Sequence, residues 1–262
     1  MPFLRPLAGT PLQVSALGLG TVKFGRNQAV KYPSGFSLPD DQQIRNLLAR
    51  ARELGINLID TAPAYGSSEQ RLGALLENRH DWIIVTKVGE EFADGVSSFD
   101  FSGTHTRHSI ERSLQRLKTD YLDLVLIHSD GNDLDILEHS DCVAMLRQCQ
   151  ESGLVRHIGM SIKTEAGGEL AASLLDVVML TWNLQQQDTR TLAQATRLNK
   201  GVLVKKGLMS GHVQNSARDL VLESMQLSFR EPHIHSMIVG TLNPAHLEQN
   251  VETAKRVLAN RD

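Results

Sequence analysis

Four polar side chains stand where apolar runs of the sequence end. Asp60 ends a short apolar run, and Tyr65 follows five residues later across a tight loop. Lys87 ends the run Trp-Ile-Ile-Val-Thr-Lys, and His128 ends the run Leu-Asp-Leu-Val-Leu-Ile-His. If these runs are neighbouring parallel strands, their carboxyl ends meet at one edge. The four side chains would then form an acid–base cluster.

Each of these residues alone has an ordinary structural explanation, but together they suit proton transfer to an oxygen atom. A buried Lys87 needs a carboxylate partner, and Asp60 is available on the adjacent strand end. The ordinary pKa of tyrosine is about 10, and a neighbouring ammonium lowers it by stabilising the phenolate. Tyr65 could then act as a general acid while His128 orients the substrate oxygen. The cluster has no nucleophile and no metal-ligand pattern, so a cofactor is expected to react with the attached carbon.

The apolar runs that would carry these residues alternate with amphipathic segments along the chain. Predicted strands cover residues 15–20, 57–60, 82–87, 122–128, 156–161, 177–181, 202–205 and 237–240. Predicted helices cover residues 40–54, 68–77, 108–117, 137–152, 188–198 and 244–258. Strands this apolar are buried on both faces, as in a parallel sheet, and the strand–helix alternation predicts βαβ units.

Eight such repeats without a break in composition favour an α/β fold, a closed (β/α)8 barrel that forms a single domain over residues 1–262. An open doubly wound sheet is the alternative. It lacks support because residues 16–21 are too apolar for a Gly-x-Gly-x-x-Gly fingerprint and precede no predicted helix. Residues 6–14, with a turn at Gly9, predict a small hairpin ahead of the barrel. Two long loops, residues 23–39 and 89–106, contain aromatic side chains and are expected to shape a substrate pocket.

Composition excludes several classes of function. The chain has 262 residues, a formal net charge of -3 and no basic run, so nucleic-acid binding is not expected. No signal peptide or membrane-spanning run is present, which predicts a cytoplasmic protein. Cys142 and Cys149 would stand roughly 10 Å apart on a helix, too far for a disulfide, as suits a reducing compartment. Nothing in the sequence requires an oligomer.

Several segments resemble the aldo-keto reductase family. Gly55-Ile-Asn-Leu-Ile-Asp-Thr-Ala, with the Tyr-Gly and Ser-Glu-Gln-Arg-Leu-Gly that follow it, is similar to the family's first signature. Residues 113–128 resemble its second signature, and residues 14–21 and 240–250 resemble its opening strand and cofactor loop. The resemblance implies a TIM-type barrel that binds an extended nicotinamide cofactor without a Rossmann domain. It also implies reduction of small carbonyl substrates, with Asp60, Tyr65, Lys87 and His128 as the catalytic tetrad.

The same resemblance implies a set of cofactor contacts. Gly20, Thr21 and Asp60 would lie near the nicotinamide ribose, and Ser161 and Asn183 would hold the carboxamide. Gly207, Leu208, Ser210 and Gly211 would run along the pyrophosphate, with Lys205 or Lys206 as charge partners. Gly240, Thr241, Gln249 and Asn250 would surround the adenosine end, with His246 near the 2′-phosphate of NADP.

Three departures from the family pattern affect the cofactor and substrate expectations. Ile162 and Met179 stand where the family often has Asn and Gln, which weakens the carboxamide site. The loop at residues 240–246 contains no Lys or Arg. NADP(H) is therefore expected with a weak preference, and NAD(H) is the alternative. The chain ends soon after its last predicted helix, so an open substrate pocket is expected.

Two other functions remain as alternatives. A subunit that binds nicotinamide cofactor as a redox sensor or regulator would not need the complete tetrad. An isomerase or aldolase that uses Lys87 as a Schiff base would leave Tyr65 and the loop at Gly240 unexplained.

Overall fold

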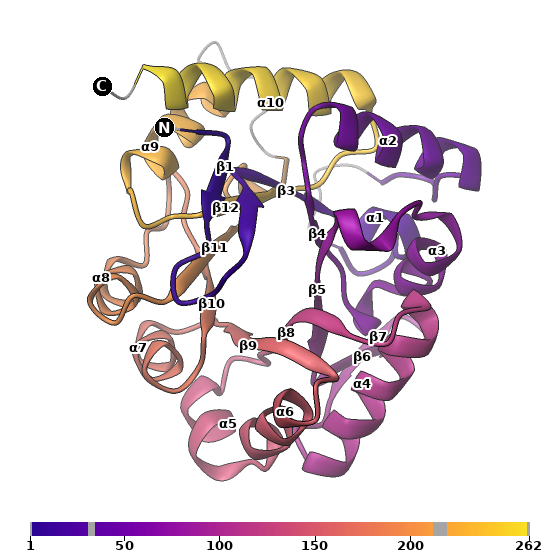
Figure 1. Cartoon of the computed structure of the whole chain (residues 1–262), viewed down its shortest axis with the longest axis vertical. Coiled ribbons are helices and arrows are strands. Elements are labelled where there is room, and N and C mark those ends of the chain that lie inside the picture. The colour runs from indigo at the N-terminus through magenta and orange to yellow at the C-terminus, as the bar shows by residue number, and fades with distance from the viewer. Residues whose placement is uncertain (1, 31–34, 212–218, 261–262) are drawn as a thin grey trace.

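The computed structural model of the chain describes residues 2–30, 35–211 and 219–260. In these residues eight parallel strands close a barrel in chain order, and the last strand pairs with the first (Figure 1). The barrel strands are β3 (Leu17–Gly20), β4 (Leu58–Asp60), β5 (Ile83–Val88), β8 (Leu122–His128), β9 (Val155–Ser161), β10 (Val177–Thr181), β11 (Gly201–Lys205) and β12 (Ser236–Val239). The predicted closed barrel is confirmed.

Helices form a ring around the outside of the barrel (Figure 1). They are α1 (Val22–Gly25), α2 (Asp41–Glu53), α3 (Ser68–Leu75), α4 (Gly103–Leu117), α5 (Asp133–His139), α6 (Cys142–Glu151), α7 (Glu165–Leu174), α8 (Thr189–Arg197), α9 (Leu220–Arg230) and α10 (Pro244–Ala259). Short 3-10 helices are η1 (Pro63–Tyr65), η2 (Arg79–Asp81) and η3 (Met209–Gly211). No described helix is both long and apolar enough to cross a membrane.

Two antiparallel hairpins lie outside the barrel wall. The first joins β1 (Leu4–Pro6) to β2 (Gln13–Ser15), and its buried Leu7 and Val14 pack with barrel-interior residues such as Leu124. This confirms the expected N-terminal hairpin and gives the barrel an apolar floor. The second joins β6 (Glu90–Ala93) to β7 (Val96–Phe99) and follows β5 directly.

Packing divides into an inner and an outer apolar cluster. Leu58, Val85, Leu126, Val177 and Leu203 are fully or almost fully buried inside the barrel, together with the two hairpin side chains. A larger cluster fills the space between the strands and the surrounding helices. This alternation of inward and outward apolar residues explains why the strand sequences are apolar throughout.

Several predicted boundaries were wrong. The predicted helix 137–152 is two helices, because the chain turns at Ser140, whose Oγ donates to Ile136 O and accepts from Cys142 N. The predicted strand 15–20 begins at Leu17, since Ser15 pairs with Leu4 in the hairpin. The predicted loop 89–106 contains the β6–β7 hairpin and the first turn of α4.

Three helices were missed, and one prediction lies partly outside the described residues. The sequence did not indicate α1, α7 or α9, and α1 follows β3 directly, where no helix was predicted. The predicted loop 23–39 overlaps α1, and its residues 31–34 fall outside the described residues. Cys142 and Cys149 are both buried, and no disulfide joins them.

Candidate active site

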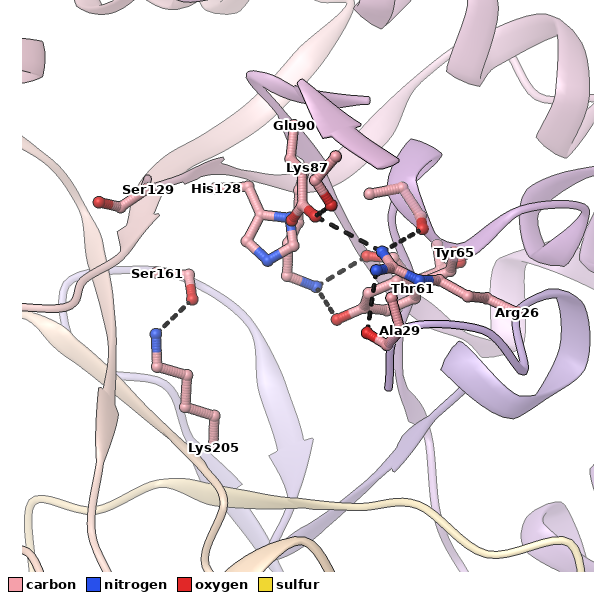
Figure 2. A network of polar contacts seen from close by, with 12 residues as sticks. Arg26, Ala29, Thr61, Tyr65, Lys87, Glu90, His128, Ser129, Ser161 and Lys205 are labelled. Carbon is pink, nitrogen blue, oxygen red and sulfur yellow. Dashed lines mark hydrogen bonds and ion pairs between the residues drawn. The ribbon is translucent and has the colours of Figure 1, made fainter. Parts of the chain in front are cut away.

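A buried ion pair stands at the carboxyl ends of β4 and β5. The Lys87 Nζ lies 2.6 Å from Asp60 Oδ1, and it also donates to Thr61 O at 2.8 Å and to the Tyr65 hydroxyl at 3.2 Å (Figure 2). The Tyr65 hydroxyl in turn donates to Asp60 Oδ2 at 3.4 Å. All three ammonium hydrogens of Lys87 therefore have acceptors, and the phenol lies against a cation and an anion.

Local backbone contacts place Tyr65 at this strand end. Tyr65 ends η1, which begins at Pro63, directly after β4. Gly66 follows with φ of 62°, and a Cβ there would meet Gly25 O at 2.2 Å, so the loop packs tightly on α1. The Thr21 hydroxyl donates to Asp60 O at 2.9 Å, which joins the ends of β3 and β4. The tyrosine is thus held by backbone packing as well as by its hydroxyl.

His128, at the end of β8, completes the predicted cluster. Its ring stands edge-on to Tyr65, with centroids 6.2 Å apart and planes at 86°. Its Nδ1 lies 2.9 Å from Glu90 Oε2, although the N–H does not point straight at that oxygen. The structure therefore brings all four predicted catalytic residues together and adds Glu90 on β6.

A second lysine lies across the same end of the barrel. Lys205 donates to Ser161 Oγ at 2.8 Å and to Ile162 O at 2.5 Å (Figure 2). Burial, and then the charge of Lys206, lower the pKa of Lys205 to about 7. The pKa of this lysine is therefore well below that of an exposed lysine, which is about 10.4.

One cavity of about 1170 Å³ joins these groups. Tyr65, Lys87 and His128 line it, and so do most of the predicted cofactor residues, namely Gly20, Thr21, Asp60, Ser161, Lys205, Leu208, Ser210, Gly211, Gly240, Thr241, His246, Gln249 and Asn250. Ile162 and Met179 also line it, so apolar side chains flank Ser161. The cavity extends from the strand ends to the first turns of α10.

Two predicted cofactor residues lie elsewhere. The Asn183 side chain donates to Lys206 O at 3.1 Å and accepts from Gln185 N and Gln186 N, so its amide is used within its own loop. Gly207 is absent from the cavity wall, and a Cβ there would meet the Met237 side chain at 2.7 Å. The Asn183 side chain thus also joins its loop to the loop after β11, and neither residue lines the cavity.

Glu90 and Arg26 are site residues that sequence reasoning missed. Both line the cavity, and they lie 3.5 Å apart. A signal was present in Asp94-Gly95, a dipeptide typical of two-residue hairpin turns, whose positive φ angles of 51° and 81° fit such a turn. That hairpin would have placed Glu90 next to the end of β5.

The comparisons with known proteins all give similarities to one enzyme family. A model of the aldo/keto reductase family matches residues 16–221. A crystal structure of an aldo-keto reductase from Pseudomonas aeruginosa is 51% identical, with 97% of this chain and 96% of that chain covered and a TM-score of 0.89. L-galactose dehydrogenase from Arabidopsis thaliana is 28% identical over 289 residues, covering 95% of this chain and 86% of that protein. NADH-specific methylglyoxal reductase from Escherichia coli is 31% identical over 168 residues, covering 59% of this chain and 50% of that protein.

The match to the family model extends from just before the first barrel strand to the start of α9, and so includes every strand end that carries the Asp60, Tyr65, Lys87 and His128 cluster. The chain belongs to the aldo/keto reductase family.

Proposed function

We propose that this chain reduces small aldehydes or ketones to alcohols, with Tyr65 as the proton donor to the carbonyl oxygen. Family membership makes it an NAD(P)-dependent oxidoreductase that acts on CH–OH groups. The Lys87–Tyr65 contact of 3.2 Å is the observation that carries the proposal. An ammonium at that distance stabilises the phenolate that remains after proton donation.

Asp60 and His128 have supporting parts in the proposal. Asp60 Oδ1, 2.6 Å from the Lys87 ammonium, keeps that ammonium beside the phenol and compensates the cost of burying it. His128 lines the same cavity as Tyr65, and its side chain helps to place the substrate. A nicotinamide cofactor bound in this cavity would supply the hydride for the carbonyl carbon. Tyr65 supplies the proton that neutralises the resulting alkoxide.

The cavity suits a dinucleotide together with a small substrate. Its volume of about 1170 Å³ exceeds the roughly 300–1,000 Å³ typical of single small-molecule pockets. Ser161 and Lys205 are the polar groups placed to meet a carboxamide. Ser210, Gly211 and the first turn of α10 line the cavity, and the positive end of the α10 dipole favours phosphates there. The donor set therefore fits a nicotinamide dinucleotide.

Cofactor preference is part of the proposal. Thr241, in the loop after β12, and His246, in the first turn of α10, line the cavity. Asn243, at the N-cap of α10, uses its side chain to accept from Ala245 N at 2.9 Å. We propose that NADPH is accepted with a weaker preference than an arginine would give, and that NADH is also used. The E. coli relative named above is NADH-specific, so family membership alone does not decide this preference.

Schiff-base chemistry on Lys87 has little support. The Lys87 amine has an acceptor for each of its three hydrogens, one of them the Asp60 carboxylate. That environment favours the ammonium, which has no lone pair to attack a carbonyl. A purely regulatory role would not need Tyr65 and Lys87 in contact inside a cavity.

The test is a panel of small aldehydes and ketones assayed with NADPH and separately with NADH. The expected result is oxidation of at least one cofactor in the presence of a carbonyl substrate. Tight cofactor binding without turnover of any carbonyl or alcohol would favour the regulatory alternative.

A further inference from the structure

We propose that the ammonium of Lys205 makes the cavity select the redox state of the nicotinamide cofactor, so that the reduced form binds more tightly than the oxidised form. The two forms differ at the ring, which is a neutral dihydropyridine in one and a cationic pyridinium in the other. The inference rests on the proposed function in one respect, because that function places the nicotinamide ring beside Tyr65.

The Lys205 side chain reaches across the end of the barrel. Lys205 is the last residue of β11, yet its Nζ donates to Ser161 Oγ at 2.8 Å and to Ile162 O at 2.5 Å, at the end of β9. Strand β10 lies between β9 and β11 in the barrel, so the side chain crosses the end of β10. Lys205 therefore lies at the cavity wall and not among the outer helices.

The same amine lies close to the residues that would carry the chemistry. Ser161, its hydrogen-bond partner, stands opposite His128 in the register of β8 and β9. The His128 ring in turn stands edge-on to Tyr65. In Figure 2, His128 lies between Ser161 and Tyr65. A nicotinamide ring that gives hydride to a carbonyl held at Tyr65 therefore has Lys205 as a near neighbour.

Lys205 differs from Lys87 in its electrostatic partners. The Lys87 ammonium pairs with the Asp60 carboxylate at 2.6 Å. Within the described ranges, Lys205 has the Ser161 hydroxyl and one backbone carbonyl as acceptors and forms no ion pair. No adjacent carboxylate cancels its positive charge. A second positive charge in the cavity is therefore repelled by it, and the repulsion grows as a bound cofactor displaces water.

The charged groups that face Lys205 come from several elements. Burial is the largest cause of its lowered pKa, and the charges of Lys206, Lys87 on β5 and Lys163 after β9 add to it. Asp133 on α5 acts in the opposite direction, although its Oδ2 already accepts from Lys163 N at 2.8 Å. Together these groups bring the pKa of Lys205 to about 7. The ammonium form therefore predominates below that pH.

A pyridinium beside this ammonium is penalised, and a dihydropyridine is not. The penalty has an upper limit, because Lys205 can release its proton when the oxidised cofactor binds. With a pKa of about 7, that release costs about tenfold in affinity at pH 6 and almost nothing at pH 9. The oxidised cofactor left after one turnover would therefore be displaced readily by reduced cofactor.

The first measurement is the ratio of two dissociation constants, that of NADP+ over that of NADPH, by equilibrium titration without substrate. The pair NAD+ and NADH is measured in the same way. Both redox forms share their phosphates and adenosine, so the ratio cancels contacts to those groups. In wild-type protein the ratio should be about tenfold higher at pH 6 than at pH 9. In Lys205→Met it should be equal at both pH values and close to the wild-type ratio at pH 9.

Two further variants separate charge from shape. Lys205→Arg keeps a positive charge throughout this pH range, so its ratio should be high at both pH values. Lys163→Met is the matched control, since Lys163 also lines the cavity but is exposed to water. Solvent and salt screen the charge of an exposed lysine, so its removal should change the ratio by less than about twofold.

The second measurement counts protons. Calorimetric titration at pH 6.5, in two buffers of different ionisation enthalpy, gives the number of protons released when each cofactor binds. NADP+ should release more protons than NADPH from wild-type protein, because the pyridinium lowers the pKa of Lys205 further. In Lys205→Met the two cofactors should release the same number.

The outcomes separate the two proposals. A wild-type ratio that does not change with pH would overturn the Lys205 inference and leave carbonyl reduction standing. A pH dependence that persists in Lys205→Met would also overturn it and assign the effect to another group, such as His128. If Lys205→Met weakens both redox forms alike at pH 6, the lysine meets the shared pyrophosphate and the inference fails. If no carbonyl is reduced with NADPH or NADH, the proposed function fails, and the binding ratios still decide the role of Lys205.

Discussion

The Lys87 ammonium and the Asp60 carboxylate form an ion pair of 2.6 Å in which both side chains are almost fully buried. They come from adjacent strands, β5 and β4, at the end of the barrel that carries the cavity. Removing both charges from such a site costs little stability, whereas removing one leaves the other unpaired and desolvated. Under the proposed function, the pair therefore serves the chemistry of Tyr65 more than the stability of the barrel.

Lys87→Met should abolish carbonyl reduction and lower the free energy of unfolding by about 3–5 kcal/mol. The double variant Asp60→Asn/Lys87→Met should be more stable than Lys87→Met alone, because no buried charge is left unpaired. Chemical denaturation of wild type, both single variants and the double variant gives the four free energies of unfolding that a double-mutant cycle needs. Additive losses of stability would mean that the two side chains do not interact.

Tyr65→Phe should keep the fold and cofactor affinity while lowering carbonyl reduction roughly a hundredfold or more, the usual effect of losing a general acid. The ring remains, and only the hydroxyl between Lys87 and Asp60 is lost. Cofactor titration by fluorescence serves as the control for an intact site. A variant that keeps more than about a tenth of wild-type turnover would remove Tyr65 from the role of acid.

His246→Arg should raise NADPH affinity by about tenfold and leave NADH affinity unchanged, because a charge-assisted contact to the 2′-phosphate is stronger than the present ones. Dissociation constants of wild type, His246→Arg and His246→Ala for both cofactors check this prediction. A strong NADPH preference that is unchanged in His246→Ala would assign the phosphate to another group.

Lys205→Met should be more stable than wild type below pH 7, and the advantage should shrink as the pH rises. The folded-state pKa of Lys205 is lowered to about 7, whereas an unfolded lysine titrates near 10.4. Between these values the unfolded state binds more protons, so wild-type stability rises with pH. The difference should be about 1–3 kcal/mol, reduced because the side chain borders the open cavity. Denaturation curves at pH 6.5 and 9.5 test it, and a constant difference between the two proteins would contradict it.

The strand ends could be predicted from sequence because the apolar runs are short and end in polar residues. The predicted bounds of β8 and β10 match the structure, and they place His128 and Thr181 at the strand ends. The grouping of Asp60, Tyr65, Lys87 and His128 follows once the strands are parallel neighbours. The sequence does not indicate which side chains at strand ends make hydrogen bonds to the loop that follows instead of facing the cavity. Asn183 is one of these, because its side-chain oxygen accepts from Gln185 N and Gln186 N.

Contacts made across the fold explain most of the remaining errors. Glu90 lies in a hairpin whose register, Glu90 opposite Phe99, joins residues that look like an irregular loop in the sequence. The helix α7 was missed because Gly167 and Gly168 suggest a loop. A Cβ at Gly168 would lie 2.0 Å from Thr191 Oγ1, so the residue is small because α7 packs closely on α8. That reason appears only in the folded chain.

The pairing of β3 with β12 has a consequence for how the protein folds during synthesis. Leu17 lies opposite Met237, so the seam of the barrel joins residues near opposite ends of the described chain. A nascent chain cannot close the barrel until β12 has left the ribosome, and contacts of such long sequence separation form slowly. Until then the apolar inner faces of seven strands lack their eighth neighbour, and exposed apolar surface of this kind favours aggregation.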